Sequence, residues 1–317
     1  MTFPAPFAII WRMDKLRIAV IGAGRLGAIH CRIYKELDNA ELVAVCDIDK
    51  ARAEETAKTY ETRACFDYKF LLNQVDAVSI AAPTNLHYEI GRYFLSHGIH
   101  ALIEKPFTPN LKEADHLIKI ARKNKLILQV GHVERFNSAF SAVKSIIQNP
   151  QFIECHRLST FPNRSLDIGA VLDIMIHDID IVLGLVNSPL KKVESVGIAV
   201  LTQFEDIANT RLCFKNGCVA NLTASRVSDE AMRKIRIFQK NTYISLDYKE
   251  AEASVYRKDG TQISKENLPI EKEEPLKKEL ASFVQCVLNR KEPLVSGEVA
   301  RQALALALKI QKQIWQK

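Results

Sequence analysis

Hydrophobic and polar positions follow two alternating periods along the first 130 residues. Short β-branched runs such as RIAVI, LVAVC, DAVSIAA, HALI and LILQV alternate with amphipathic stretches at residues 25–37, 50–59, 85–97 and 110–124. Strands that alternate with helices in this way are typical of a parallel sheet with helices on both faces. We therefore expect a doubly wound α/β domain over residues 15–131, preceded by an N-terminal extension of residues 1–14.

The rhythm changes after residue 131. We expect a helix at 134–148, a strand at 151–161 and an apolar helix at 170–186, then a run of strands with turns at Asn216-Gly217 and Asp259-Gly260, and closing helices at 276–290 and 296–315. A run of strands with turn signals is typical of an antiparallel sheet with helices on one face. Residues 132–317 are therefore predicted to form an α+β domain with a mainly antiparallel, open-faced sheet.

The composition agrees with two folded domains. Hydrophobic residues make up 47% of the 317 residues and charged residues 26%, close to ordinary globular values. The opening MTFPAPFAIIWRM has neither the basic region nor the small-residue cleavage pattern of a signal peptide, and it is too short to span a bilayer. We expect a cytoplasmic protein that does not enter the membrane.

The seven cysteines are scattered and lie mostly in apolar segments, as buried thiols do in a reducing compartment. The closest two, Cys213 and Cys218, flank a hairpin signal that would pair Lys215 with Cys218 and leave Cys213 diagonal to it. We therefore expect no disulfide, and the sequence contains no Cys-x-x-Cys metal motif.

The charge of the chain is modestly positive. The formal net charge is +7, but no long block of lysine and arginine occurs, so nucleic acid binding is not favoured. An anionic small molecule as substrate is compatible with this charge.

A glycine-rich segment follows the strand RIAVI and opens the next helix. In this context the first glycine permits a tight turn, the second lets a pyrophosphate approach the backbone, and the third lets helix and strand pack closely. The helix N-terminus adds amide donors and a favourable dipole. The segment predicts a Rossmann dinucleotide site whose coenzyme contacts are Gly22, Gly24, Arg25, Leu26 and Gly27.

Asp47 ends the second strand, about twenty residues beyond the glycines, where a carboxylate accepts the ribose hydroxyls of a dinucleotide. The same carboxylate would repel a 2′-phosphate, so it favours NAD over NADP. Lys50 and Arg52 lie nearby and weigh against that preference.

Two further segments are expected at the carboxyl edge of the sheet, where ligands bind. Thr84 or Asn85 suits the N-cap of a helix as well as a coenzyme contact, and the two roles can coexist. Pro106 restricts Lys105 to an extended conformation that can aim its ammonium group into the crevice, although such a tripeptide is also common in surface turns. The candidate coenzyme contacts in these segments are Pro83, Thr84, Asn85, His87, Glu104 and Lys105.

A third group of polar residues lies in the apolar stretch VLDIMIHDIDIVLGL. Asp173, His177 and Asp180 have spacings of four and three residues, which place them on one stripe of a largely buried helix. Buried polar groups need partners or a ligand cavity, so the stripe is either a structural cluster or a site. A metal site of Asp173, His177 and Asp178 is not favoured, because no second histidine or cysteine has suitable helical spacing.

In their order and spacing these motifs resemble the glucose-fructose oxidoreductase / inositol dehydrogenase (Gfo/Idh/MocA) family. The motifs are GAGRLG with Asp47, PTNLH, EKP, GHVERFN at residues 131–137, and the pair of Asp173 and His177. The resemblance covers almost the whole chain from about residue 16. It implies catalysis by Lys105, Asp173 and His177, and a homodimer or homotetramer formed through the open-faced sheet.

These three residues also suit the oxidation of a secondary alcohol on chemical grounds. His177 suits the general base that takes the hydroxyl proton, and Asp173 suits a group that orients it. Lys105 suits a partner of the alcohol oxygen as charge develops.

Within the family, GHVERFN, RLSTFPNRSLD and MIHDIDIVL resemble the bacterial UDP-N-acetylglucosamine 3-dehydrogenase-like branch. That resemblance implies a nucleotide-sugar substrate and an aminotransferase as pathway partner. Guanidinium groups bind diphosphates bidentately. The candidate substrate contacts are Arg135, Arg157, Arg164 and Arg226.

Other interpretations stay open. The arginines also suit exposed solubilising charges, and Glu134 with Arg135 suits a local ion pair at a helix start. The chain also suits a polyol or inositol-type dehydrogenase, another carbonyl reductase of the family, or a non-catalytic regulator that senses NAD.

Overall fold

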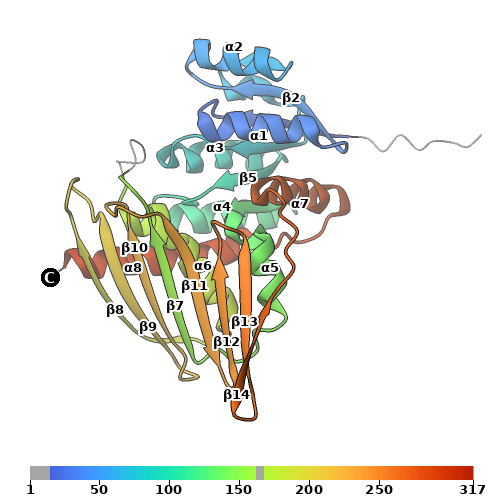
Figure 1. Cartoon of the computed structure of the whole chain (residues 1–317). Coiled ribbons are helices and arrows are strands. Elements are labelled where there is room, and N and C mark those ends of the chain that lie inside the picture. The colour runs from blue at the N-terminus through green and yellow to red at the C-terminus, as the bar shows by residue number, and fades with distance from the viewer. Residues whose placement is uncertain (1–14, 162–167, 317) are drawn as a thin grey trace, which may run out of the picture.

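The computed structural model describes residues 15–161 and 168–316, which form two sheets and the helices around them (Figure 1). The first sheet has six parallel strands in the order β3-β2-β1-β4-β5-β6. They are β1 (Leu16–Ile21), β2 (Ala40–Cys46), β3 (Arg63–Cys65), β4 (Ala77–Ile80), β5 (His100–Glu104) and β6 (Leu128–Gly131). The predicted doubly wound sheet is confirmed. The hydrophobic pattern did not reveal β3, because it has only three residues.

Helices cover both faces of this sheet. The 3-10 turn η1 (Tyr68–Leu71) precedes β4, and the helices are α1 (Arg25–Glu36), α2 (Lys50–Thr59), α3 (Thr84–Ser96) and α4 (Leu111–Lys123). The strand order reverses between β1 and β4, so their carboxyl ends open into the crevice where ligands bind in such folds.

The second sheet has eight strands in the order β14-β13-β12-β11-β7-β10-β9-β8. Its strands are β7 (Phe152–Leu158), β8 (Leu190–Ile198), β9 (Ile207–Phe214), β10 (Val219–Ser225), β11 (Met232–Gln239), β12 (Thr242–Asp247), β13 (Glu252–Asp259) and β14 (Gln262–Asn267). All neighbours are antiparallel except β7 and β10. The chain leaves the middle of the sheet after β7, returns at the edge as β8, and comes back through β9 and β10 to lie beside β7.

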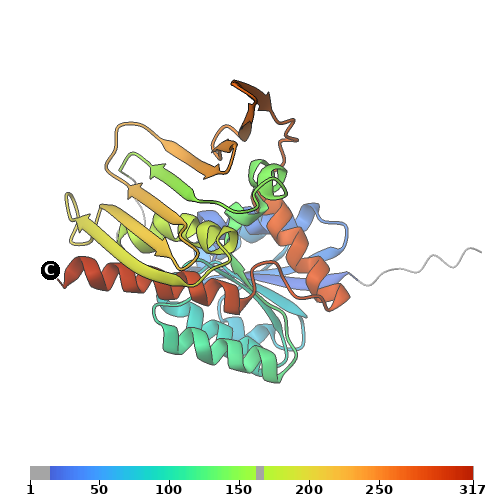
Figure 2. The same cartoon turned by 90° about the horizontal axis from the view of Figure 1, so that it is seen from below.

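Helices cover only one face of this second sheet, as Figure 2 shows from below. They are α5 (Ser138–Lys144), the π-helix η3 (Val171–Met175) with α6 (Ile176–Leu185), and α8 (Gly297–Trp315). On the other face Phe238 stacks on Tyr243, with ring centroids 4.8 Å apart, and Tyr243 stacks on Tyr256, at 4.9 Å. The predicted open-faced sheet is confirmed.

The two C-terminal helices serve both sheets. Helix α7 (Pro275–Asn289) lies beside α1, and its Leu280, Phe283 and Val284 share one core with Ile18 of β1. Helix α8 packs on α4 and β6 of the first half and on α6 and β8 of the second. The domain boundary predicted at residue 131 assigned both helices to the second domain. The hydrophobic pattern of a helix shows which of its faces is buried, but it does not show against which sheet that face packs.

Two predicted helices differ from the structure in their local form. The helix predicted at 134–148 is a 3-10 turn η2 (Val133–Phe136) followed by α5, because the Asn137 side chain accepts a hydrogen bond from Ala139 N at 3.0 Å and starts a new helix. The helix predicted at 170–186 begins as the π-helix η3. Both features depend on the local hydrogen-bond pattern, which hydrophobic spacing does not encode.

The predicted register of the β9–β10 hairpin is wrong by one residue. Phe214 N donates to Cys218 O at 2.9 Å, so Phe214 and Cys218 close the hairpin and Cys213 lies opposite Val219. The loop therefore has one more residue than a two-residue turn, and Gly217 takes a φ of +90°. All seven cysteines are free thiols.

Within the described residues, no helix is long and apolar enough to cross a membrane.

Candidate active site

The glycine-rich turn at the end of β1 has the geometry of a phosphate cradle. Gly22 has a φ of +102°, and a Cβ there would lie 2.7 Å from Ala81 O. A Cβ on Gly27 would lie 1.8 Å from Gly22 O, so this glycine allows α1 to pack against the turn. At Gly24 a Cβ would meet nothing within 4 Å, which leaves the backbone at the start of α1 open to a ligand. Gly22 thus permits the turn, Gly27 permits the contact between helix and strand, and Gly24 permits the approach of a ligand. A dinucleotide-binding turn needs glycine for these three purposes.

Asp47 lies directly beside this turn. Its Oδ2 accepts a hydrogen bond from Ala23 N at 2.8 Å, and its Oδ1 accepts one from Asp49 N at 2.9 Å. A cavity of about 540 Å³ opens next to it, lined by Gly22, Ile48, Phe66 and Pro83 among others. The volume suits a nucleoside, and the carboxylate at its wall suits the ribose hydroxyls.

The segment before α3 closes the other side of this cavity. Neither Thr84 nor Asn85 caps the helix, because Pro83 occupies the N-cap position and no side chain makes a capping bond. The predicted capping role is therefore wrong. His87 is buried with its ring nitrogens 2.9 Å from Ala82 O and 3.0 Å from Pro106 O, so it links the loop after β4 to the loop after β5.

Lys105 reaches from the end of β5 to the π-helix of the second half. Its Nζ lies 3.0 Å from Asp173 Oδ1 and also donates to Asp173 O. The two side chains are only 19% and 16% exposed. Glu104 contacts the backbone of the lysine, because its Oε2 accepts a hydrogen bond from Lys105 N at 3.2 Å. The sequence thus identified two residues, 68 positions apart, that the fold brings into contact.

His177 lies one turn beyond Asp173, in the first turn of α6. Burial lowers the pKa of its imidazole well below 6.5, and the positive charges of Lys105 and Arg157 lower it further. The ring is therefore neutral near pH 7, which is the form a general base requires. Asp173 does not bond to it, so the predicted stripe is not an internally paired cluster: Asp173 pairs with Lys105 instead. π-helical turns of this kind are frequent at functional sites.

The other carboxylates of α6 bind arginines from separate elements. Asp178 accepts hydrogen bonds from Arg157 of β7 at 2.8 and 3.1 Å, and Arg157 also donates to Glu134 at 2.7 Å. Asp180 binds Arg135 at 2.5 and 3.0 Å. The local pair predicted between Glu134 and Arg135 does not form, since each has a partner elsewhere. Arg135 and Arg157 are thus held by internal carboxylates instead of being exposed.

Arg226 is fully buried and donates to Asp206 Oδ1 at 2.8 Å and to Ile168 O at 2.8 Å. Beside it, Glu205 O accepts a hydrogen bond from Ala170 N at 2.7 Å. Together these bonds hold the backbone that leads into η3. Arg226 is therefore a structural residue here, and neither of the roles considered for it, a diphosphate contact or a solubilising charge, agrees with this position. Arg164 lies outside the described residues.

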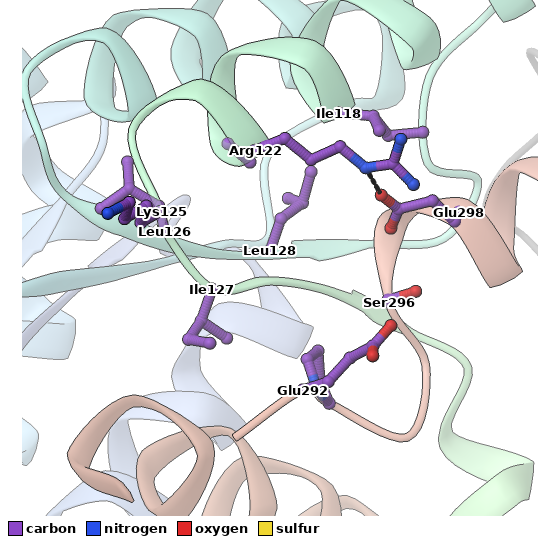
Figure 3. A pocket seen from close by; sticks show the side chains of 11 residues that line it. Ile118, Arg122, Lys125, Leu126, Ile127, Leu128, Glu292, Ser296 and Glu298 are labelled. Atoms are coloured by element: carbon purple, nitrogen blue, oxygen red, sulfur yellow. Dashed lines mark hydrogen bonds and ion pairs between the residues drawn. The ribbon is translucent and has the colours of Figure 1, made fainter. Parts of the chain in front are cut away.

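A different pocket, of about 400 Å³, lies at the opposite edge of the first sheet, between α4, the start of β6 and the loop before α8 (Figure 3). Two of its charged residues, Arg122 and Glu298, pair with each other at 2.6 Å. It is remote from the glycine turn and from Lys105, so we place the candidate site at the carboxyl edge. In residues 15–161 and 168–316 no group of three or more His, Cys, Asp or Glu side chains could hold a metal ion.

Comparisons with known proteins agree with this geometry. Residues 16–132 match the model of an oxidoreductase family with an NAD-binding Rossmann fold, and residues 130–244 match the GFO/IDH/MocA C-terminal domain. The UDP-N-acetylglucosamine 3-dehydrogenase of Acidithiobacillus ferrooxidans is 35% identical over 305 residues, 94% of this chain and 97% of that protein. The chain belongs to the Gfo/Idh/MocA family.

A solved structure of that dehydrogenase superposes with a TM-score of 0.90 over 95% of this chain and 98% of its own. The myo-inositol 2-dehydrogenase of Thermotoga maritima is 28% identical over 95% of this chain and 97% of its own length. The chain is therefore an NAD-binding oxidoreductase of the Gfo/Idh/MocA family, as its motifs had indicated.

Two residues near the Gfo/Idh/MocA site were missed by the sequence reasoning. His132, directly after β6, is buried, and neither of its ring nitrogens has a hydrogen-bond partner among the described residues. Its ring centroid lies 6.3 Å from that of His177. Arg233 of β11 contributes a positive charge that acts on His177. The alternation of MRKIRIFQ could have revealed Arg233, because it has the same parity as the buried Ile235 and Ile237. His132 lies within the motif GHVERFN, but nothing in that motif indicated that its side chain is buried beside His177.

Proposed function

We propose that this chain oxidises a secondary hydroxyl of a nucleotide-linked sugar, specifically C3 of UDP-N-acetylglucosamine, with NAD as coenzyme. The observation that carries the proposal is the Lys105–Asp173 contact beside a neutral His177 at the edge where the coenzyme cradle opens. The substrate is supported by the likeness over nearly the whole chain to a UDP-N-acetylglucosamine 3-dehydrogenase.

In this proposal each residue has a separate task. His177 takes the proton of the C3 hydroxyl, which its neutral imidazole permits. Lys105 donates a hydrogen bond to the same oxygen as negative charge develops, and Asp173 fixes the lysine. Bound NAD supplies the acceptor for the hydride that leaves C3. One proton and one hydride leave the alcohol, and a ketone remains.

The coenzyme is held, in this proposal, by the glycine turn and the strand ends around it. Gly22, Gly24 and Gly27 shape the turn, and Asp47 receives the ribose hydroxyls. Further contacts come from the start of α1 and from the loops after β4 and β5. These contacts are Arg25, Leu26, Pro83, Thr84, Asn85, His87, Glu104 and Lys105.

We expect Asp47→Ala to weaken NAD binding about 10- to 100-fold, because a charge-assisted hydrogen bond to the ribose is lost. NADP binding should change less or improve, because the carboxylate no longer repels a 2′-phosphate. Fluorescence titration with both coenzymes measures the two dissociation constants. Asp49→Ala is the matched control, since Asp49 caps α2 two residues away. An unchanged NAD to NADP ratio in Asp47→Ala would remove this residue from the ribose contact.

The proposal extends to the setting of the enzyme. We infer a cytoplasmic protein that forms a homodimer or homotetramer through the uncovered sheet face, where Val196 and Ile198 are exposed. An aminotransferase that consumes a 3-keto sugar is the pathway partner that fits the product.

A polyol substrate is the second candidate, favoured by the likeness to a myo-inositol 2-dehydrogenase over 95% of the chain. A non-catalytic NAD sensor is less well supported, because both Lys105 and His177 are present. We favour the nucleotide sugar, because the UDP-N-acetylglucosamine 3-dehydrogenase has a higher sequence identity to this chain than the myo-inositol 2-dehydrogenase has.

The test is the formation of reduced coenzyme by the purified protein with NAD and UDP-N-acetylglucosamine, with a carbonyl trap present to draw off the ketone. We expect turnover that depends on both compounds, and a trap adduct of a ketone that is two hydrogens lighter than the substrate. The same assay with myo-inositol is the comparison. Turnover of the polyol alone, by a protein that binds NAD, would replace the nucleotide-sugar assignment.

A further inference from the structure

Strand β11 carries an arginine at the edge of the candidate site. Ile237, Ile235 and Arg233 follow one another at every second position, so all three point to the helix-covered face of the second sheet. Ile237 and Ile235 are buried there, whereas Arg233 is exposed. These three side chains therefore extend from the core beneath the helices to the rim of the sheet, which is the place where the helices no longer cover it.

The pairing with β7 fixes where this rim lies. Arg233 is directly opposite Arg157 in the antiparallel register, and residues paired in this way share one face of the sheet. Arg157 binds Asp178, the neighbour of His177 in α6. The charge of Arg233 acts on both His177 and Asp178. Arg233 thus faces the same space as the candidate base.

Arg233 differs from Lys105 and Arg157 around this space, because its side chain has no partner in the part of the chain that the structure describes. Lys105 is bound by Asp173, and Arg157 by Asp178 and Glu134. Among residues 15–161 and 168–316, the guanidinium of Arg233 makes no hydrogen bond or ion pair, and its backbone oxygen accepts a hydrogen bond from Tyr248 N at 2.8 Å. An exposed guanidinium presents five N–H donors in the planar arrangement that matches phosphate oxygens.

We propose that Arg233 binds the diphosphate of the nucleotide sugar and so selects nucleotide-linked sugars over free ones. The inference rests on the proposed function, because it needs a substrate with a diphosphate. The sugar then lies toward Lys105 and His177, and the nucleoside lies outward along the rim. The earlier arginine candidates that the structure describes are held by internal carboxylates, which leaves this cation available to a substrate anion.

The experiment compares substrate kinetics of the full-length variants with UDP as a binding probe. In Arg233→Gln we expect the KM for UDP-N-acetylglucosamine to rise about 10- to 100-fold, because a charged hydrogen-bond partner is lost. The inhibition constant of UDP should rise in parallel. The kcat should change only a few-fold, and the dissociation constant of NAD should stay the same. Arg233→Lys keeps the positive charge but cannot make two parallel hydrogen bonds to the diphosphate. Its KM should therefore lie between that of the wild type and that of Arg233→Gln.

The matched control is Arg236→Gln on the same strand. Arg236 points to the opposite face and pairs with Glu154 at 3.2 Å, so this variant removes one positive charge without touching the site. An active Arg233→Gln with unchanged KM and unchanged UDP inhibition would overturn the assignment. Equal effects in Arg236→Gln would also overturn it, because they would show that the loss of a charge away from the site is sufficient.

Failure of the proposed function has a different signature. In that case the wild-type protein binds NAD but neither turns over UDP-N-acetylglucosamine nor is protected by UDP against thermal unfolding. The diphosphate assignment to Arg233 then falls together with the proposed function. Wild-type turnover with normal kinetics in Arg233→Gln contradicts the assignment alone.

Discussion

Replacing Lys105 with alanine is expected to lower kcat about 10²- to 10³-fold, because the alcohol oxygen loses its hydrogen-bond donor as charge develops. The variant also leaves Asp173 without its 3.0 Å partner, so the start of the catalytic helix keeps an uncompensated carboxylate. The affinity for NAD should remain within a few-fold. Steady-state kinetics with UDP-N-acetylglucosamine, together with a fluorescence titration of NAD, measure both quantities.

Added ethylamine should restore part of the lost turnover of Lys105→Ala, since a free ammonium group can occupy the vacated space. Lys112→Ala is the control, because Lys112 is exposed in the first turn of α4 and lies outside the site. If Lys105→Ala instead lost NAD binding with little change in kcat, the lysine would belong to the coenzyme site and not to the reaction.

Replacing His177 with alanine is expected to lower kcat/KM about 10²- to 10⁴-fold, the usual contribution of a positioned general base. For the wild-type enzyme, the acidic fall in kcat/KM should lie below pH 6.5, because burial and the nearby cations lower the pKa of His177. Activity is present where the imidazole is neutral, so it persists above that pKa and is lost as the pH falls through it. In His177→Ala this acidic limb should disappear, which a pH profile between 4.5 and 8.5 (about two units either side of 6.5) would reveal.

The pH profile of kcat/KM also tests whether Lys105 and His177 interact. Lys105 lowers the pKa of His177, so the residual activity of Lys105→Ala should show an acidic limb at higher pH than the wild type. Imidazole should restore part of the activity of His177→Ala, whereas ethylamine should not. An acidic limb that stays in place in His177→Ala would assign the base to another group, for which the buried His132 is the nearest candidate.

The first half of the fold was predictable because its signals are local. Each strand except β3 is a short apolar run, each helix has a polar face, and the glycines have separate steric tasks, so GAGRLG and Asp47 already indicated a coenzyme cradle. Lys105, Asp173 and His177 were selected as candidates for a related reason. Each is a polar group in a setting that otherwise favours apolar residues or a rigid turn.

The partners of the charged residues were not predictable from the sequence. Arg157 and Arg226 look like exposed charges in a one-dimensional pattern, yet each is buried against a carboxylate, 21 and 20 positions away, which only the folded chain brings near. The π-helical turn at Asp173 was missed because it changes the hydrogen-bond ladder and not the hydrophobic spacing. Arg233 was missed because no single residue marks the place where helix cover ends over a sheet.

The placement of α7 and α8 bears on how the protein is made by the ribosome. The first sheet is synthesised early, but one of its faces is completed by Leu280, Phe283 and Val284 of α7, which are synthesised after all the strands of both sheets. Until then the apolar side chains beneath them, such as Ile18 and Val20, lack part of their cover. The first sheet therefore gains its full cover only after α7 has been synthesised, and the nascent N-terminal half depends on α7 for part of its core.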